Sequence, residues 1–247
     1  IVNPVPVIEL QTSTLVCSND PTFFTLLDAG ITNGTATSNY TYIWSKDGVV
    51  IPTATSYTLN VNAEGIYTVK VINSMGCFRI RTITVIASNA AQFNMPTIMD
   101  LSDNNTVIIN VTGLGNYVFS LDYPNAYQEI NIFTDVPPGV HTVYVKDLDG
   151  CGTSSQIIEV IGIPKFFTPN DDGFNDTWNV KGLTTTKNYN TSIYIFDRYG
   201  KLLKELSPIS NGWDGTFNGE PLPTDDYWYT IYFEDGRTSK GHFTLKR

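Results

Sequence analysis

Short runs in which apolar and polar residues alternate recur along the whole 247-residue chain, separated by turns rich in Gly, Asn and Asp. The run GIYTVKVIN, residues 65–73, is one example. Successive side chains of a β-strand point to opposite faces of a sheet, so a period of two predicts half-buried strands. The 19 Gly and 13 Pro, with only 16% charged residues, favour short strands and many turns over long helices. The pattern therefore predicts an all-β protein.

The strand-like runs fall into three successive blocks of similar size, which we expect at residues 1–88, 89–162 and 163–247. The first two blocks share a phrase, GIYTVKVINSMGC at residues 65–77 and GVHTVYVKDLDGC at residues 139–151. An internal repeat of this kind is typical of tandem domains in a stalk. We therefore expect tandem β-sandwich domains arranged as an elongated rod.

The first two blocks resemble known surface modules. The first block carries Cys17, Trp44 and Cys77 in that order and resembles an immunoglobulin-like or PKD-like β-sandwich, with Trp44 expected in the core between two sheets. The second block contains YVFSLDYPNAYQEINIFTDVPPGVHTVYVKDLDGCG, which resembles the adhesin-type repeats of large surface proteins of gliding Bacteroidota.

The cysteines indicate a compartment. Cys17 and Cys77 bracket the strand-rich first block, whereas Cys151 lies well beyond it, so we expect a Cys17–Cys77 disulfide and a spare thiol at Cys151. Closing a loop of about 60 residues removes about 4 kcal/mol of unfolded-state freedom in a chain-entropy treatment. Such a bridge indicates an oxidising, extracytoplasmic setting. The alternative is three reduced cysteines that behave as small buried hydrophobes.

The third block has the most specific pattern. Four features occur there in order: FFTPNDDGFNDTW, IYIFDRYGKLL, GWDGTFNGEPLPTDDYWYTIYF and the closing hairpin EDGRTSKGHFTLKR. Together they resemble the gliding-motility-associated C-terminal domain, the type B sorting signal of the Bacteroidota type IX secretion system, over residues 163–247. The resemblance implies that a folded β-sandwich is recognised at the outer membrane and that its cargo is exported to the cell surface or released.

The same resemblance implies the partners and the location. The expected receptor is an outer-membrane β-barrel of the PorP/SprF type, or the related shuttle barrel, together with the translocon. The expected location is extracellular or at the cell surface, associated with the outer membrane.

Aromatic residues in the third block are candidates for docking. The hairpin IYIFDRYGKLL is apolar on both faces. In YWYTIYF, alternate residues form two rows on opposite faces of the strand, one that starts at Tyr227 and one that starts at Trp228. One row can fill a core while the other leaves aromatics near the surface for a partner. The alternative is that these aromatics pack beneath the loops of a small domain. The candidate docking residues are Tyr227, Trp228, Tyr229, Phe243, Lys246 and Arg247.

A dense cluster of Asn and Asp lies in NDDGFNDT, residues 170–177. Calcium takes six to eight oxygen ligands, and the candidate ligands are Asn170, Asp172, Asn175 and Asp176. An EF-hand loop is not matched, because Thr168 and Asn179 stand where that loop requires acidic ligands. The alternative is a cluster of Asx turns, in which the side chains bond their own backbone. In either case the role is structural.

Several functions are disfavoured. The formal net charge is −9 and no basic run could follow phosphates, so a nucleic-acid partner is not expected. No apolar stretch approaches the roughly 18 residues that a transmembrane helix needs. No Ser-His-Asp order, P-loop or His-Glu-X-X-His motif occurs, so we expect no enzyme.

We therefore expect the C-terminal part of a large secreted or surface-anchored adhesin-like protein whose last domain directs its export. The chain reads as a piece of something longer, because it lacks an initiator Met and a signal-peptide layout. The alternative is an array of carbohydrate-binding modules appended to a secreted enzyme, with Trp44, Trp213 or Trp228 as a sugar-stacking platform.

Overall fold

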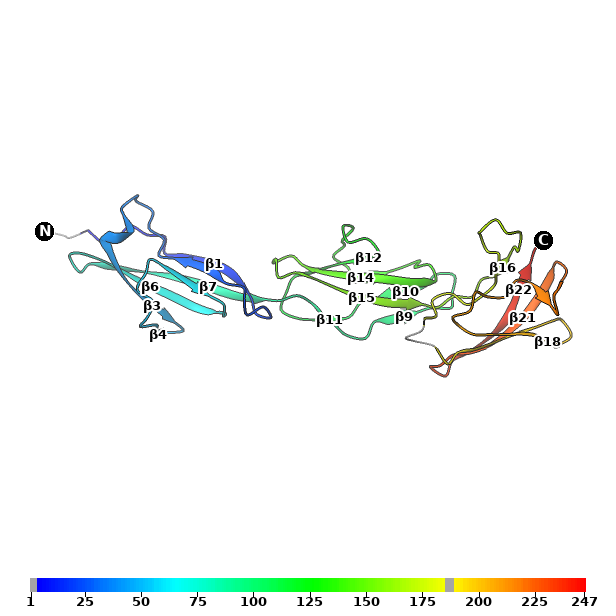
Figure 1. The fold of residues 1–247 in the computed structure, drawn as a ribbon. Coiled ribbons are helices and arrows are strands. Elements are labelled where there is room, and N and C mark those ends of the chain that lie inside the picture. The colour runs from blue at the N-terminus through cyan, green and yellow to red at the C-terminus, as the bar shows by residue number, and fades with distance from the viewer. Residues whose placement is uncertain (1–3, 185–188) are drawn as a thin grey trace.

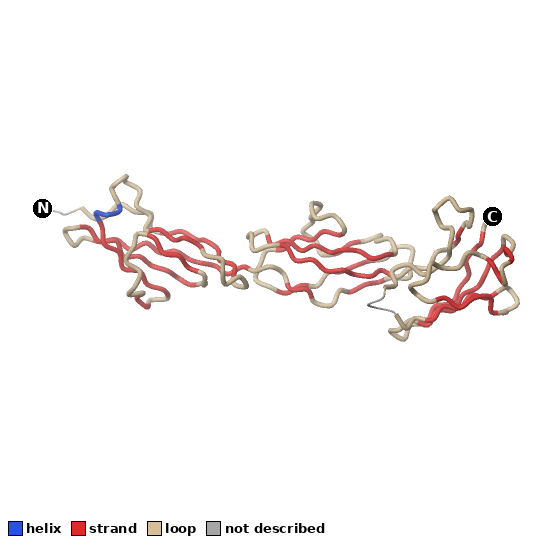
Figure 2. The backbone as a smooth tube through the Cα atoms, viewed as in Figure 1, coloured by secondary structure: helices blue, strands red, loops and turns tan. Residues whose placement is uncertain are grey.

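The computed structural model describes residues 4–184 and 189–247 and consists almost entirely of strands and loops (Figure 2). Within those residues a three-residue 3-10 helix, η1 (Thr37–Asn39), is the one helix. None of the helices described is long and apolar enough to cross a membrane. The sheets follow one another in a row from the N-terminus to the C-terminus (Figure 1). The predicted all-β fold of tandem sandwich domains in an elongated rod is confirmed.

The first unit pairs a large sheet, in the order β1-β7-β6-β3-β4, with a small sheet of β2 and β5. Its strands are β1 (Gln11–Cys17), β2 (Thr25–Asp28), β3 (Tyr40–Lys46), β4 (Val49–Val50), β5 (Thr58–Val61), β6 (Gly65–Asn73) and β7 (Phe78–Ser88). Alternate residues of β3 and β6 enter the core, where Trp44, Val69 and Val71 are completely buried. The Trp44 indole N–H donates to the Ser56 carbonyl oxygen (2.8 Å), which satisfies its polar atom.

The middle unit contains the sheets β12-β14-β15, β13-β10-β9 and β11-β8. Its strands are β8 (Gln92–Phe93), β9 (Thr97–Met99), β10 (Thr106–Ile108), β11 (Val111–Thr112), β12 (Tyr117–Leu121), β13 (Ile132–Phe133), β14 (Gly139–Asp147) and β15 (Thr153–Val160). Val143 and Val145 of β14 pack with Val107 of β10 in a core of its own. The repeated phrase of the sequence thus forms the long strand β6 in the first unit and β14 in the middle unit.

The C-terminal unit has a five-stranded sheet, in the order β16-β22-β21-β17-β18, and a small β19-β20 hairpin. Its strands are β16 (Phe166–Phe167), β17 (Ser192–Phe196), β18 (Leu202–Leu206), β19 (Thr216–Phe217), β20 (Glu220–Pro221), β21 (Asp225–Tyr232) and β22 (Thr238–Leu245). Its core is aromatic: Trp178 stacks on Phe243 with ring centroids 3.9 Å apart, and Trp213 lies edge-on to Tyr227 at 5.1 Å. Ile161 already packs into this core, and the boundaries expected after residues 88 and 162 stay predictions.

The disulfide joins Cys17 to Cys151, with 5.4 Å between the two Cα atoms, and Cys77 is free. The predicted Cys17–Cys77 bridge and the spare thiol at Cys151 are therefore wrong. The reason is the parallel pairing of β1 with β7, which places Cys17 beside Ser88 at the end of β7, whereas Cys77 precedes its start. Ten residues of strand separate those ends by about 33 Å, far beyond the reach of a disulfide.

A buried carboxylate reinforces the same junction between the first and middle units. Asp147, at the end of β14, is 1% exposed. Its carboxylate accepts hydrogen bonds from the Ser88 hydroxyl (2.8 Å) and from the backbone N–H groups of Asn116 (3.0 Å) and Cys151 (3.1 Å). A buried charge is tolerated only when its oxygens have such partners. The first and middle units are thus joined both covalently and by a polar cluster.

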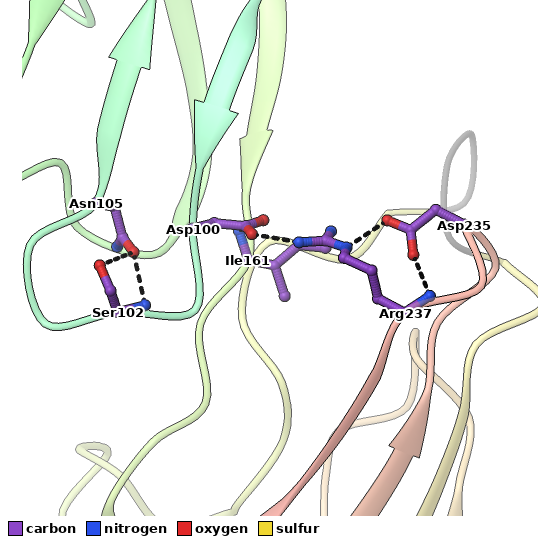
Figure 3. A network of polar contacts seen from close by, with 6 residues as sticks. All are labelled: Asp100, Ser102, Asn105, Ile161, Asp235 and Arg237. Carbon is purple, nitrogen blue, oxygen red and sulfur yellow. Dashed lines mark hydrogen bonds and ion pairs between the residues drawn. The ribbon is translucent and has the colours of Figure 1, made fainter.

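The junction between the middle and C-terminal units has its own polar contacts (Figure 3). Asp100, whose side chain is 5% exposed, accepts from the Ile161 N–H (3.2 Å) and forms an ion pair with Arg237 of the β21–β22 hairpin (2.5 Å). Arg237 also contacts Asp235 of that hairpin (2.7 Å), which fixes its guanidinium group. Lys165 and Asp103 add an exposed pair at 2.6 Å.

Candidate docking surface of the C-terminal unit

The sheet of the C-terminal unit has one face in the core and one face toward solvent. Strands β21 and β22 pair along their whole length, with Tyr227 opposite Phe243 and Trp228 opposite His242. Since successive residues alternate between faces, the row of Tyr227, Ile231 and Phe243 fills the core. The other row leaves Trp228 39% exposed and Tyr232 49% exposed.

This arrangement corrects part of the predicted docking set. Tyr227 is 4% exposed and Phe243 is completely buried, so neither side chain can contact a partner, and their assignment to docking is wrong. Tyr229 is half-buried and packs against the same core. The alternation in the sequence could not decide between the rows because both rows are aromatic.

The two basic residues at the end of the predicted docking set lie at the surface, and one of them has internal partners. Arg247 donates from Nε to the Leu222 carbonyl oxygen (3.0 Å) and from its guanidinium to the Gly215 carbonyl oxygen (3.3 Å). The Lys246 ammonium lies over the Phe166 ring, 4.6 Å from its centroid, in a cation–π contact. Arg247 therefore secures the β19–β20 region, and Lys246 remains exposed.

The solvent-facing side carries an aromatic cluster that we call the outer aromatic face: Tyr194, Phe196, Trp228 and Tyr232. Phe196 pairs with Trp228 across β17 and β21, and Tyr194 lies edge-on to Tyr232 with centroids 6.3 Å apart. The Trp228 and His242 rings are 6.4 Å apart, so the cluster extends onto β22. Tyr194 and Phe196 lie outside the docking set predicted from the sequence, and the signal for them is the second apolar face of their hairpin.

Two of the three tryptophans proposed as a sugar-stacking platform are buried. Trp44 is completely buried and Trp213 is 1% exposed, so neither presents a ring face to solvent. Both indole N–H groups donate to backbone carbonyls of their own units, Trp44 to Ser56 and Trp213 to Thr216. These residues are core residues, and only Trp228 among the three reaches the surface.

The Asn and Asp cluster forms the loop between β16 and Trp178, and Asp176 organises it. The Asp176 carboxylate accepts from the backbone N–H groups of Asn170 (3.1 Å), Asp171 (2.7 Å) and Gly173 (2.8 Å). Hydrogen bonds to a carboxylate are stronger than those between neutral groups. The Asp176 side chain therefore fixes the conformation of this loop.

The backbone conformation explains why the loop is so rich in Asn, Asp and Gly. Asp171, Gly173 and Asn175 have φ angles of 61°, 87° and 53°. Asn, Asp and Gly adopt this left-handed region far more readily than other residues. Asp172 also accepts from the Phe174 N–H (2.8 Å), which is an Asx turn. The turn interpretation of this cluster is confirmed by these hydrogen bonds.

Calcium binding by the same loop stays a prediction. A hydrogen bond from the Asn170 amide, and a second from the Phe174 N–H, hold the pKa of Asp172 below its ordinary value. In the described part of the chain, no three Asp, Glu, His or Cys side chains converge as a metal site would require; amide ligands such as Asn170 and Asn175 are outside that count.

If the loop binds calcium, a chelator lowers the melting temperature of the chain, and Asp172→Ala removes this sensitivity, because the native state alone gains the binding free energy. Asp176→Ala is expected to lower the melting temperature even in the presence of chelator, because it leaves three backbone N–H groups without their acceptor. Identical melting curves of the unsubstituted chain with and without chelator would exclude the calcium role.

The fold and this surface define an all-β chain of successive sheet-built units, the last of which has an aromatic core. Residues 161–245 match the CHU_C type IX secretion signal domain. The chain therefore carries this domain, as the resemblance in the third block predicted. The domain supports export through the type IX secretion system and a surface or extracellular location. None of the curated proteins matches the sequence.

Several solved structures are similar to the chain. Sidekick-1 immunoglobulin domains 1–5 share 13% identity over 98% of this chain and 58% of that chain, with a TM-score of 0.41. The insect immune protein hemolin shares 13% identity over 98% and 76%, with a TM-score of 0.39. A Bacteroides ovatus mixed-linkage glucan utilisation locus protein, SGBP-B, shares 14% identity over 99% and 71%, with a TM-score of 0.26. This chain thus spans little more than half of the Sidekick-1 structure, and scores this low support no functional conclusion.

Proposed function

We propose that the chain is the C-terminal part of a large cell-surface or secreted adhesin-like protein of a Bacteroidota bacterium, and that residues 163–247 are its export address. The observation that carries the proposal is the match of residues 161–245 to a type IX secretion signal domain. The same stretch supplies a core built around Phe167, Trp178 and Phe243. An address of this kind has to be a folded, self-contained surface that outer-membrane machinery can recognise.

The two preceding units would serve as a stalk, an immunoglobulin-like or PKD-like domain over residues 1–88 and an adhesin-repeat-like domain over residues 89–162. The contacts at the two junctions support this stalk role. The Cys17–Cys151 disulfide and the buried Asp147 cluster tie the first two units together, and the Asp100–Arg237 ion pair ties the third to the second. Units joined in this way would hold an adhesive region of the protein at a fixed distance from its C-terminal unit.

The outer aromatic face is the proposed docking site for the export machinery, an outer-membrane β-barrel of the PorP/SprF type or the shuttle barrel, with the translocon. Trp228 and Tyr232 expose large ring surfaces that combine apolar area with a polar atom, a chemistry enriched at protein interfaces. Exposed clusters of this kind on small domains mark interaction sites.

A fusion of residues 163–247 to a fluorescent protein tests this role for the outer aromatic face, with a second fusion of residues 89–247 in case the middle unit is needed. Both are expected to cross the outer membrane only when the partner barrel is co-expressed. Trp228→Ala with Tyr232→Ala is expected to reduce export at least tenfold, since anchor aromatics contribute about 2 kcal/mol or more each. Tyr199→Ala, an 88% exposed tyrosine in the β17–β18 turn, is the matched control and leaves export unchanged. Equal export of both variants would remove the aromatic face from the proposal.

A further inference from the structure

Strand β22 is paired on one side along its whole length and on the other side only at its end. All eight residues of β22 pair with β21, whereas β16 reaches only Thr244 and Leu245 (Figure 1). Among the described residues, the stretch from Thr238 to His242 therefore has no neighbouring strand on its second side.

The register shows which backbone groups point to that side. The Phe233 N–H donates to the Arg237 carbonyl (2.9 Å) at the hairpin end, and the Thr244 N–H donates to the Lys165 carbonyl (3.0 Å) at the β16 end. Hydrogen-bonded and non-hydrogen-bonded pairs alternate along an antiparallel ladder. The N–H and C=O groups of Thr238, Lys240 and His242 therefore point away from β21, and nothing in the described ranges pairs with them.

A groove of about 810 Å³ runs beside this open edge. It is lined by Leu101–Asp103 and Pro138 of the middle unit, by the linker residues 162–165, and by Tyr229, Gly241 and His242 of the sheet. Gly241 lets the Tyr229 ring lie across the strand, since a Cβ there would be 2.5 Å from the Tyr229 hydroxyl oxygen.

The chain's own linker cannot fill the groove as a strand. Gly162 is held by two hydrogen bonds to Lys181, with N···O distances of 3.2 and 2.8 Å. Pro164 has no N–H to donate. The linker reaches the edge only at Lys165, where β16 begins to pair. Room for an extended strand therefore remains next to unpaired backbone groups.

The side chains on this edge select the charge of the occupant. Lys240 and His242 are exposed on the same face. Asp226 lies 3.8 Å from the His242 ring nitrogen, whereas Lys240 has no ion pair within residues 4–184 and 189–247. A second copy of β22 paired antiparallel would bring basic side chains together, which is unfavourable. A strand with acidic side chains at alternate positions is complementary.

We propose that the open edge of β22, from Thr238 to His242, accepts an extended segment of a partner protein that carries acidic side chains at every second position. The segment lies in the groove, forms backbone hydrogen bonds with Lys240 and His242, and adds a strand to the sheet in line with β16. Main-chain hydrogen bonds supply affinity in this mode, and alternate side chains supply specificity. This site borders the outer aromatic face at His242 but uses the backbone edge of β22, not the ring surfaces of that face, and the proposal does not depend on the export role.

Amide hydrogen exchange of the whole chain, followed by NMR, tests the edge directly. Without a partner the Lys240 and His242 amides are expected to exchange at least about tenfold faster than those of Ser239 and Gly241, which face β21. The probe is a short blocked peptide of alternating Glu and Thr. Its addition is expected to slow exchange at Lys240 and His242 about tenfold or more, as a newly formed hydrogen bond would.

Variants and control peptides separate the backbone contribution from the charge contribution. Lys240→Glu is expected to abolish the protection, whereas Lys204→Glu on β18, the opposite edge of the same sheet, leaves it intact. A probe with Lys in place of Glu, and one with alternate backbone nitrogens methylated, are expected to give no protection.

Protection of Lys240 and His242 without any peptide in dilute protein would show that the edge is not open. Protection that rises with chain concentration would assign the edge to a second copy of the chain. No protection by the Glu peptide, or equal protection by the methylated peptide, would contradict the proposed pairing.

Discussion

Removal of Lys240–Arg247 is expected to retain a fluorescent fusion carrying residues 163–247 in the periplasm. Strand β22 lies between β16 and β21, and its Phe243 and Leu245 are completely buried. Truncation of one buried Phe to Ala typically costs 3–5 kcal/mol, which approaches the whole stability of a small domain. The deletion removes that residue, Leu245 and an entire strand ladder, so the address no longer folds.

The measurement is the share of fluorescence in periplasmic and extracellular fractions. Phe243→Ala, which keeps the strand but opens a cavity beside Trp178, is expected to reduce export as well. Lys204→Ala, an exposed position on β18 at the other edge of the sheet, is the control and exports normally. Normal export of the deletion would mean that recognition does not require the folded sandwich.

Opening the cross-link between the first two units is expected to lower their melting temperature strongly. The disulfide joins residues 134 positions apart. Cys17→Ser or Cys151→Ser gives the unfolded chain back its conformational entropy, which lowers the free energy of unfolding by about 5 kcal/mol. At about 2–4 °C per kcal/mol, the melting temperature of these two units falls by about 10–20 °C. The buried Asp147 keeps its hydrogen bonds to Ser88 and Asn116, so each unit retains its strands.

Cys77→Ser is the matched control, because this thiol has no disulfide partner and is expected to leave the melting temperature unchanged. Mass analysis without reduction is expected to show Cys17 joined to Cys151 and Cys77 open to alkylation. A Cys17–Cys77 peptide, or three free thiols, would contradict the structure at this point.

Local patterns in the sequence predicted the strands because a strand and its turns are fixed by neighbouring residues. The run at residues 65–73 forms β6 over Gly65–Asn73. The turn after β3 places Asp47 and Gly48 at φ angles of 49° and 83°, the conformation that Asp and Gly adopt most readily. The Asn and Asp loop follows the same rule, which is why its turn interpretation could be made from composition and spacing.

Long-range pairing could not be predicted in the same way. The partner of Cys17 depends on β1 running parallel to β7, which no local pattern specifies. The docking residues depend on which face of β21 meets the core, and both rows of YWYTIYF are aromatic. The open edge of β22 depends on β16 being only two residues long, since Pro164 and the Gly162–Lys181 bridge keep the preceding residues away.

The measurement that tests the export address most directly is the location of the residue 163–247 fusion in matched cells with and without a working type IX translocon. We expect the fusion at the surface or in the medium of competent cells and in the periplasm of deficient cells. Export that is equal in the two strains would contradict the assignment and leave the C-terminal unit as a further stalk domain.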